Sequence, residues 1–157
     1  IKVSVLRLPN VYGPRAAINN VSLTFNNYFI GLALQDKDIT VYGDGSQRRN
    51  LVYVDDVVDA LIKASQSEKA NGEVFFCSSD EHFSVAQIAQ QTVDVFGSGR
   101  VKFIPWPSDP SRLDVGHVCL SNAKIKNILG WKPTTDFKTG LRKTKDYYAQ
   151  CLEQYLS

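Results

Sequence analysis

The chain has 157 residues, of which 43% are hydrophobic and 22% charged, so it can bury one sizeable core as a single domain. Its 18 Lys and Arg residues against 16 Asp and Glu give a formal net charge of +2, and the two signs are mixed without the basic face that nucleic-acid binding requires. No apolar run reaches membrane-spanning length, and the 3 cysteines fit neither a zinc pattern nor a disulfide framework. We therefore expect a cytoplasmic protein that binds no metal, nucleic acid or membrane.

The beginning of the sequence predicts that it is part of something longer. It starts at Ile1, contains no methionine, and enters a strand-like apolar run at residues 2–8 with no basic-then-apolar leader before it. We expect an excised domain or a partial gene product.

Strand-like and helix-like segments alternate from here onward. Residues 21–34 show helical spacing of their apolar side chains, and residues 39–42 and 50–54 have the character of strands on either side of a Gly-Asp-Gly-Ser turn. A helix then begins at Asp55 and Asp56, whose carboxylates would cap it and complement its dipole. The stripe of this helix that faces the core is predicted to be Val57, Val58, Leu61 and Ile62.

The second half continues the same alternation. Its predicted elements are a strand at residues 73–77, a helix from Ser84, a strand at 101–104, a loop at 105–111 and helices at 121–130 and 137–155. Ser84 and Gln87 have the spacing of a capping box, and Ser121 is placed to cap the next helix. Alternating strands and helices predict a mixed α/β fold, of the α/β or α+β class.

Three blocks of sequence distinguish this chain. They are RLPNVYGPR at residues 7–15, ITVYGDGSQRRNLVYVDDVVDAL at residues 39–61 and NAKIKNILGWKP at residues 122–133. In order and spacing they resemble the extended short-chain dehydrogenase/reductase family of sugar-nucleotide epimerases, 4,6-dehydratases and decarboxylases, over nearly the whole chain. The resemblance implies that residues 1–157 are the single nucleotide-sugar-binding domain of an extended Rossmann-type enzyme, together with one or two late strands of the larger sheet.

Arg49 is the residue best suited to a nucleotide sugar. A guanidinium donates two parallel hydrogen bonds to phosphate oxygens, and the resemblance implies that the Arg after the Gly-Asp-Gly turn holds the pyrophosphate. The alternative role for Arg49 is a surface ion pair with Asp55 or Asp56. Its neighbour Arg48 points to the opposite face of a strand, where we expect it to be exposed.

Asn10 and Pro9 lie where a loop leaves the sheet, the usual place for ligands in open α/β folds. The resemblance implies that Asn10 contacts the substrate phosphates and that the backbone of Pro9 touches the nicotinamide end of the cofactor. The alternative role for Asn10 is an Asx-turn that opens the loop.

Other predicted substrate contacts come from the resemblance as well. Thr24 and Phe25 fall where the family begins the helix over the nucleotide, and Thr40 and Tyr42 share one face of the strand that lines the base and ribose. Core packing is the alternative for Phe25 and Tyr42. Arg112 resembles a late family Arg that closes over the phosphates, although the family pattern R-P-G-D is replaced here by Arg-Leu-Asp.

The family's cofactor and catalytic motifs are missing from the sequence. The chain contains no G-x-x-G-x-x-G turn, and none of its 7 tyrosines has Lys four residues later. The resemblance therefore implies that the cofactor-binding Rossmann half is absent, that NAD or NADP belongs to the longer enzyme, and that this chain carries no catalytic residue.

Two functions remain open. In the first, this half holds a nucleotide-diphosphate sugar while the missing half transfers a hydride to NAD(P), and epimerisation, dehydration or decarboxylation follows. In the second, the chain is a free-standing nucleotide-sugar-binding or assembly module. Apolar surface left bare by the missing Rossmann half also predicts self-association.

Overall fold

Short strands alternate with helices in the computed structural model, which describes residues 1–107 and 116–156. The strands are β1 (Val5–Arg7), β2 (Asn10–Tyr12), β3 (Ile39–Tyr42), β4 (Arg48–Arg49), β5 (Leu51–Tyr53), β6 (Val74–Phe76), β7 (Phe83–Ser84) and β8 (Val101–Ile104). The helices are α1 (Phe25–Leu34), α2 (Val54–Gln66), α3 (Val85–Phe96), α4 (Ala123–Leu129) and α5 (Phe137–Tyr148), with the 3-10 turns η1 (Glu68–Ala70) and η2 (Leu152–Tyr155). Within these ranges no helix is long and apolar enough to cross a bilayer.

The strands associate in pairs, and most pairs are parallel. β1 pairs with β6, β2 with β5 and β3 with β8 in parallel, whereas β4 and β7 are antiparallel. Parallel neighbours need long crossover connections, which the helices provide here. The mixed α/β prediction is confirmed.

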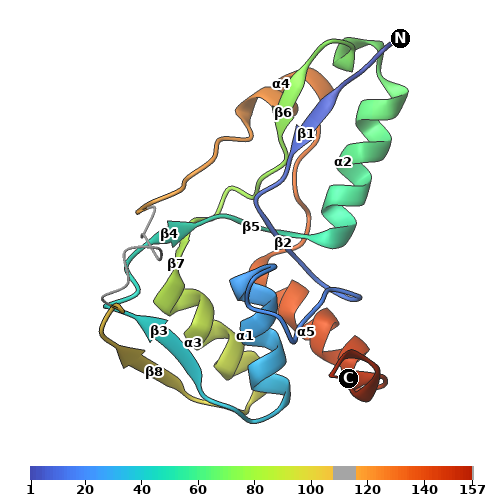
Figure 1. Cartoon of the computed structure of the whole chain (residues 1–157). Coiled ribbons are helices and arrows are strands. Elements are labelled where there is room, and N and C mark those ends of the chain that lie inside the picture. Colours follow the sequence, from blue (N-terminus) through green and yellow to red (C-terminus); the bar gives the residue numbers. More distant parts are fainter. Residues whose placement is uncertain (108–115, 157) are drawn as a thin grey trace.

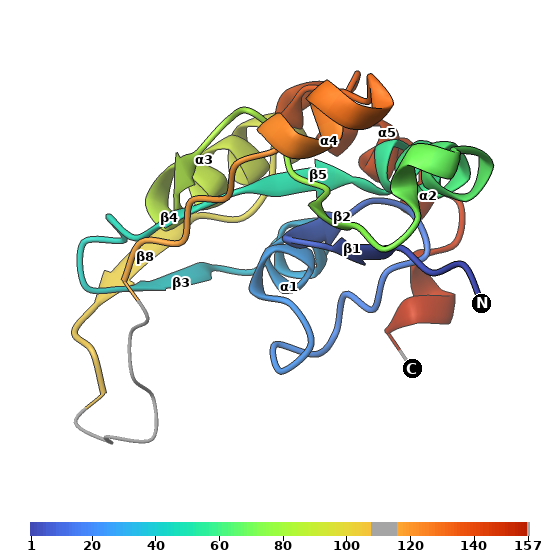
Figure 2. The same ribbon diagram turned by 90° about the horizontal axis from the view of Figure 1, so that it is seen from above.

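Strand β5 separates two apolar clusters. Its Leu51 and Tyr53 belong to a cluster with α1, α3 and α5, whereas Val52 belongs to a cluster with α2, α4 and β6. Alternate residues of a strand point to opposite faces, so this strand forms a wall of both cores. Figure 1 shows the consequence, with β1, β6, α2 and α4 at one end of the molecule and β3, β8, α1 and α3 at the other. Figure 2 looks from above along the line between these ends, with α3 and α4 drawn on one side of β5 and α1 on the other.

The capping box that opens α3 is confirmed. The Ser84 hydroxyl accepts from the backbone N–H of Gln87 at 3.0 Å, and the Gln87 side chain accepts from the backbone N–H of Ser84 at 2.8 Å. This helix packs against both α1 and α5, so its fixed start orients the larger apolar cluster.

Two predicted helix boundaries were wrong. Helix α1 begins at Phe25 rather than residue 21, because Thr24 is extended at φ −151° and ψ 127°. Asn122 directly precedes helix α4 without a side-chain cap bond, whereas the predicted capping residue Ser121 accepts with its hydroxyl from the N–H of Ala123, the first residue of α4, at 3.3 Å. Helix α5 ends at Tyr148, and the chain then turns so that the hydroxyl of Tyr155 meets that of Tyr147 at 2.7 Å.

The predicted core face of α2 was also largely wrong. Val57 is buried as expected, but Val58, Leu61 and Ile62 are 48%, 49% and 48% exposed. The buried face instead carries Val57, Ala60 and Ala64, since small side chains let the helix approach the strands closely. The large apolar residues that predicted the core face therefore lie mostly on the exposed face of α2.

Asp56 does not act as a cap. It is 4% exposed, and its carboxylate accepts from the backbone N–H and hydroxyl of Thr134 at 2.9 and 2.7 Å and from the N–H of Thr135 at 3.1 Å. The backbone carbonyl of Asp56 also accepts from the indole N–H of buried Trp131 at 3.1 Å. The first turn of α2 thus anchors the segment that leads from α4 to α5.

Candidate functional site

A cavity of about 740 Å³ opens beside α1, β3 and the end of β8. Its lining includes the predicted residues Phe25, Thr40, Tyr42 and Arg49, together with Tyr28 and Trp106. Thr40 and Tyr42 line it together because they lie two residues apart on β3. Among the described residues the cavity combines flat aromatic side chains with the Arg49 guanidinium, and we call it the aromatic cavity.

Trp106 is a lining residue that the sequence did not reveal. Its ring stacks on that of Tyr42 with centroids 5.3 Å apart and planes 28° apart, and the residue is 42% exposed. Gly43 makes room for this stack, because a Cβ there would lie 2.6 Å from the indole nitrogen of Trp106. The Gly-Asp-Gly turn therefore allows an aromatic ring to lie over the end of β3.

A second cavity, of about 320 Å³, lies at the start of β2 and is more polar; we call it the amide cavity. Its lining is Leu8, Pro9, Asn10, Arg49, Asn50, Val118 and Leu120. The parallel pairing of β2 with β5 sets Asn10 beside Leu51, and the Asn10 side-chain amide donates to the backbone carbonyl of Asn50 at 3.3 Å. Asn10 is thus the first residue of β2 rather than a loop residue, and its side chain bonds to the chain just before the paired strand β5. Within the described residues it makes no Asx-turn.

Arg49 lines both cavities. One guanidinium nitrogen donates to the carbonyl of Arg48 at 2.8 Å and to the carbonyl of Gly116. Asp55 and Asp56 form no ion pair with Arg49 among the described residues, since the Asp56 carboxylate is held by Thr134 and Thr135. Arg48 is exposed, as the strand alternation predicted.

One predicted site residue within the described ranges, Thr24, is not brought to this place. Thr24 lines a different cavity, next to Pro14 and Asn27, and its hydroxyl accepts from the Asn27 side chain at 2.8 Å. Phe25, the next residue, faces the aromatic cavity and contacts Phe29 edge-on with centroids 5.4 Å apart. Arg112 lies outside the described residues.

The residues present do not by themselves fit a dinucleotide cofactor. The sequence lacks the glycine turn on which a pyrophosphate of NAD rests, and Pro9 is the one predicted cofactor contact in the amide cavity. In residues 1–107 and 116–156, no group of three His, Cys, Asp or Glu could hold a metal ion. In the described part of the chain, the two cavities offer aromatic surface, the Arg49 guanidinium, side-chain amides and the Asp38 carboxylate.

Comparison with known proteins identifies the relatives of this chain. The model of the NAD dependent epimerase/dehydratase family matches residues 1–86, which is more than half of the chain. The chain belongs to this family. Family members of known activity include UDP-glucuronic acid decarboxylase 1 of Xenopus tropicalis, which is 33% identical over 98% of this chain. The predicted membership of the extended short-chain dehydrogenases/reductases is confirmed.

Solved structures of the family share the fold. The UDP-glucose 4-epimerase of Thermotoga maritima, solved with UDP-glucose, matches 97% of this chain with a TM-score of 0.85 and 30% identity. The UDP-glucuronic acid 4-epimerase of Bacillus cereus, solved with UDP-glucuronic acid and NAD, matches 96% with a TM-score of 0.76 and 28% identity. This chain spans 47% and 46% of those two epimerases and 35% of the Xenopus decarboxylase. It thus corresponds to less than half of each relative.

Proposed function

We propose that residues 1–157 form the nucleotide-sugar-binding domain of an NAD(P)-dependent sugar-nucleotide epimerase, dehydratase or decarboxylase. The observation that carries this proposal is the position of Arg49, on the wall of the aromatic cavity and of the amide cavity at once. A nucleoside diphosphate sugar has a flat base at one end, a polar sugar at the other and two phosphates between them. The order of chemical groups in the ligand matches the order of side chains in the site.

In this arrangement the aromatic cavity takes the base and ribose. Phe25, Thr40, Tyr42 and Trp106 offer it ring faces and a hydroxyl. Arg49 meets the pyrophosphate, where charge-assisted hydrogen bonds are each worth about 1.5 to 3 kcal/mol. Asn10 then faces the phosphate or sugar end from the amide cavity.

The contribution of this chain is to bind and orient the substrate and to neutralise its charge. Relatives that are more than twice as long support a second, cofactor-binding part in the complete enzyme. NAD(P), when bound there, supplies the hydride acceptor. The Gly-rich turn and the Tyr and Lys of the family's catalytic pair would also come from that part, since this sequence has neither motif.

The proposal is tested by titrating the chain with UDP-glucose, and with UDP, dTDP, CDP and GDP, in a calorimeter. Arg49→Ala should weaken binding of the preferred nucleotide by about 10- to 150-fold, the equivalent of one lost charge-assisted hydrogen bond. Arg48→Ala is the matched control, because it removes the same charge from the adjacent exposed position. Its affinity should stay within about twofold of wild type, apart from the weak long-range effect of the charge.

Equal losses in the Arg48 and Arg49 variants would mean that only net charge matters, which would contradict the assigned site. An absence of binding to every nucleotide by the wild-type chain would overturn the proposed function itself.

The same proposal assigns a partner to the apolar surface at one end of the molecule. Val3 before β1 and Val5 within it are 56% and 45% exposed, and Val58 and Leu61 on α2 are 48% and 49% exposed. We propose that the cofactor-binding part covers this surface in the complete enzyme and that the chain by itself associates through it. Sedimentation of the chain should show a concentration-dependent dimer or larger species. A monomer at high concentration would contradict the assignment.

A further inference from the structure

We propose that Asn50 is the positioning residue of this site, setting the place of the Asn10 amide and of the chain segment that faces Arg49. The inference rests on the proposed function, because it concerns the same amide cavity. Asn50 stands between β4 and β5 and is 2% exposed, so it is buried at the junction of the site with the core.

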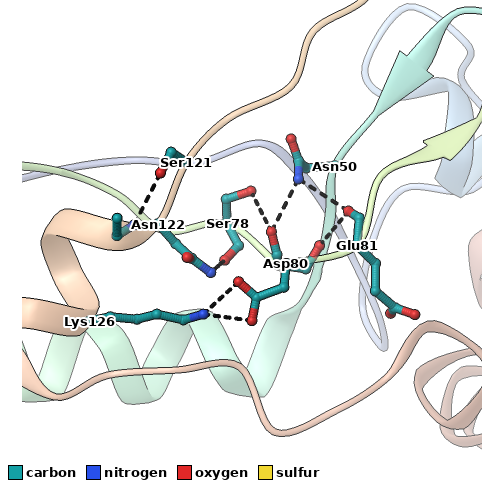
Figure 3. A network of polar contacts seen from close by, with 9 residues as sticks. Asn50, Ser78, Asp80, Glu81, Ser121, Asn122 and Lys126 are labelled. Carbon is teal, nitrogen blue, oxygen red and sulfur yellow. Dashed lines mark hydrogen bonds and ion pairs between the residues drawn. The ribbon is translucent and has the colours of Figure 1, made fainter.

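The Asn50 side chain uses both kinds of hydrogen-bonding group that an amide has. Its nitrogen donates to the backbone carbonyls of Ser79 and Glu81, each at 3.1 Å, and its oxygen accepts from the backbone N–H of Leu120 at 2.7 Å. Figure 3 shows the two donated bonds reaching the loop before β7. One side chain therefore joins two chain segments, residues 79–81 and Leu120, that are distant in the sequence.

These bonds lead directly to the predicted ligand contacts. The backbone carbonyl of Asn50 accepts from the side-chain amide of Asn10 at 3.3 Å. The N–H of Val118 donates to the carbonyl of Arg48 at 2.9 Å, and the guanidinium of Arg49 donates to the carbonyl of Gly116. Three consecutive residues, 48–50, thus hold the segment from Gly116 to Leu120, and the part of it formed by Val118 and Leu120 lines the amide cavity.

The loop that receives the Asn50 amide is itself anchored. The side chain of Asn122, which is 5% exposed, donates to the carbonyl of Ser78 at 2.7 Å. The Lys126 ammonium contacts both oxygens of Asp80, at 2.5 and 2.7 Å, and this hydrogen bonding lowers the pKa of the Asp80 carboxyl. Figure 3 shows these contacts around the same loop. Asn50 therefore bonds to a loop that other contacts already hold in place. Its side chain is fixed by that loop and can in turn hold Leu120.

Only a side-chain amide of this length satisfies the arrangement. Aspartate has the same shape but no donor, so its oxygen would face the carbonyls of Ser79 and Glu81. Alanine would leave the N–H of Leu120 and both carbonyls without this partner. Neither change alters the Asn10 or Arg49 side chain. Because Asn50 itself also lines the amide cavity, a shift of the Asn10 amide resonances is the readout that reports a change in position.

The experiment compares Asn50→Ala with Asn122→Ala. Both remove a buried Asn that is bonded to the same loop, but Asn122 does not line the amide cavity. For each variant we would measure the free energy of unfolding, the affinity for UDP, and the NMR resonances of the Asn10 side-chain amide. Asn50→Ser, which puts one hydroxyl in place of the amide, replaces Asn50→Ala if the latter does not fold.

Both variants should lose stability, but only the Asn50 variant should shift the Asn10 amide resonances and bind UDP at least about tenfold more weakly. Unchanged Asn10 resonances and unchanged UDP affinity in a folded Asn50 variant would overturn the inference while leaving the proposed function intact. Equal effects of both variants would show a general structural role and overturn it as well. If the wild-type chain binds no UDP, the proposed function loses support, and the Asn10 resonances alone still decide whether Asn50 positions this side chain.

Discussion

Replacement of Asp56 by alanine tests how the start of α2 is held against the segment between α4 and α5. Its carboxylate bonds to the backbone N–H and hydroxyl of Thr134 and to the N–H of Thr135, all within 3.1 Å. These bonds fix the start of α2 against the segment between α4 and α5. The substitution removes the bonds and leaves the backbone carbonyl that accepts from Trp131 in place.

The expected magnitude follows from the surroundings of the three donors. Hydrogen bonds to a charged group contribute about 1.5 to 3 kcal/mol each when buried. Thr134 is exposed and Thr135 is half-buried, so water replaces part of what the carboxylate provided. We therefore expect a loss of about 2 to 4 kcal/mol in the free energy of unfolding, or roughly 4 to 16 °C in Tm for a domain of this size.

Thermal and urea unfolding followed by circular dichroism would measure the loss. Asp55→Ala is the matched control, since Asp55 is the exposed neighbour in the same helical turn, and its effect should stay within about 0.5 kcal/mol. If both substitutions cost the same, the carboxylates act through the helix dipole alone, and the anchoring role of Asp56 is refuted.

Two further predictions concern other parts of the chain. Gly43→Ala should cost about 1 to 2 kcal/mol, because Gly43 has φ +61°, and it should also displace the Trp106 ring, which near-ultraviolet circular dichroism would detect. An unchanged aromatic spectrum would contradict the packing of Trp106 on this turn. Burial raises the pKa of the Cys77 thiol from 9.0 to about 12, so the protonated thiol stabilises the fold below about pH 9 and this contribution is lost as the pH rises toward about 12. The free energy of unfolding, measured with urea, should therefore fall more between about pH 9 and pH 12 in the wild type than in Cys77→Ala. If the two proteins show the same dependence on pH, the buried thiol makes no such contribution.

Local signals in the sequence predicted much of the fold. The residues of β3 and β8 were predicted with the bounds that the structure shows, and Ser84 with Gln87 gave the start of α3. Each of these depends on nearest neighbours in the chain, such as alternating side chains or a side chain that bonds to its own helix. The face of α2 was mistaken because close packing of Ala60 against the sheet depends on the opposing surface, which no local pattern contains.

The site could be predicted only in part for the same reason. Arg49 and Asn10 carry charged and amide groups in blocks that resemble a known family, and the structure places both at one cavity. Trp106 and Asn50 gave no signal, because their roles arise from contacts with segments far away in the sequence. In the sequence, Trp106 is a tryptophan in a loop and Asn50 an asparagine before a strand. Only the folded chain shows that Trp106 stacks on Tyr42 and that Asn50 bonds to Leu120.

The most direct test of the central claim is a titration of the isotope-labelled chain with UDP-glucose, followed through its indole N–H resonances. The chain has 2 tryptophans, Trp106 at the aromatic cavity and Trp131 fully buried in the other apolar cluster. Trp106→Phe assigns the two signals. A nucleotide in the aromatic cavity should shift the Trp106 resonance in proportion to saturation and leave that of Trp131 in place, whereas binding that leaves Trp106 unmoved would contradict the proposed site.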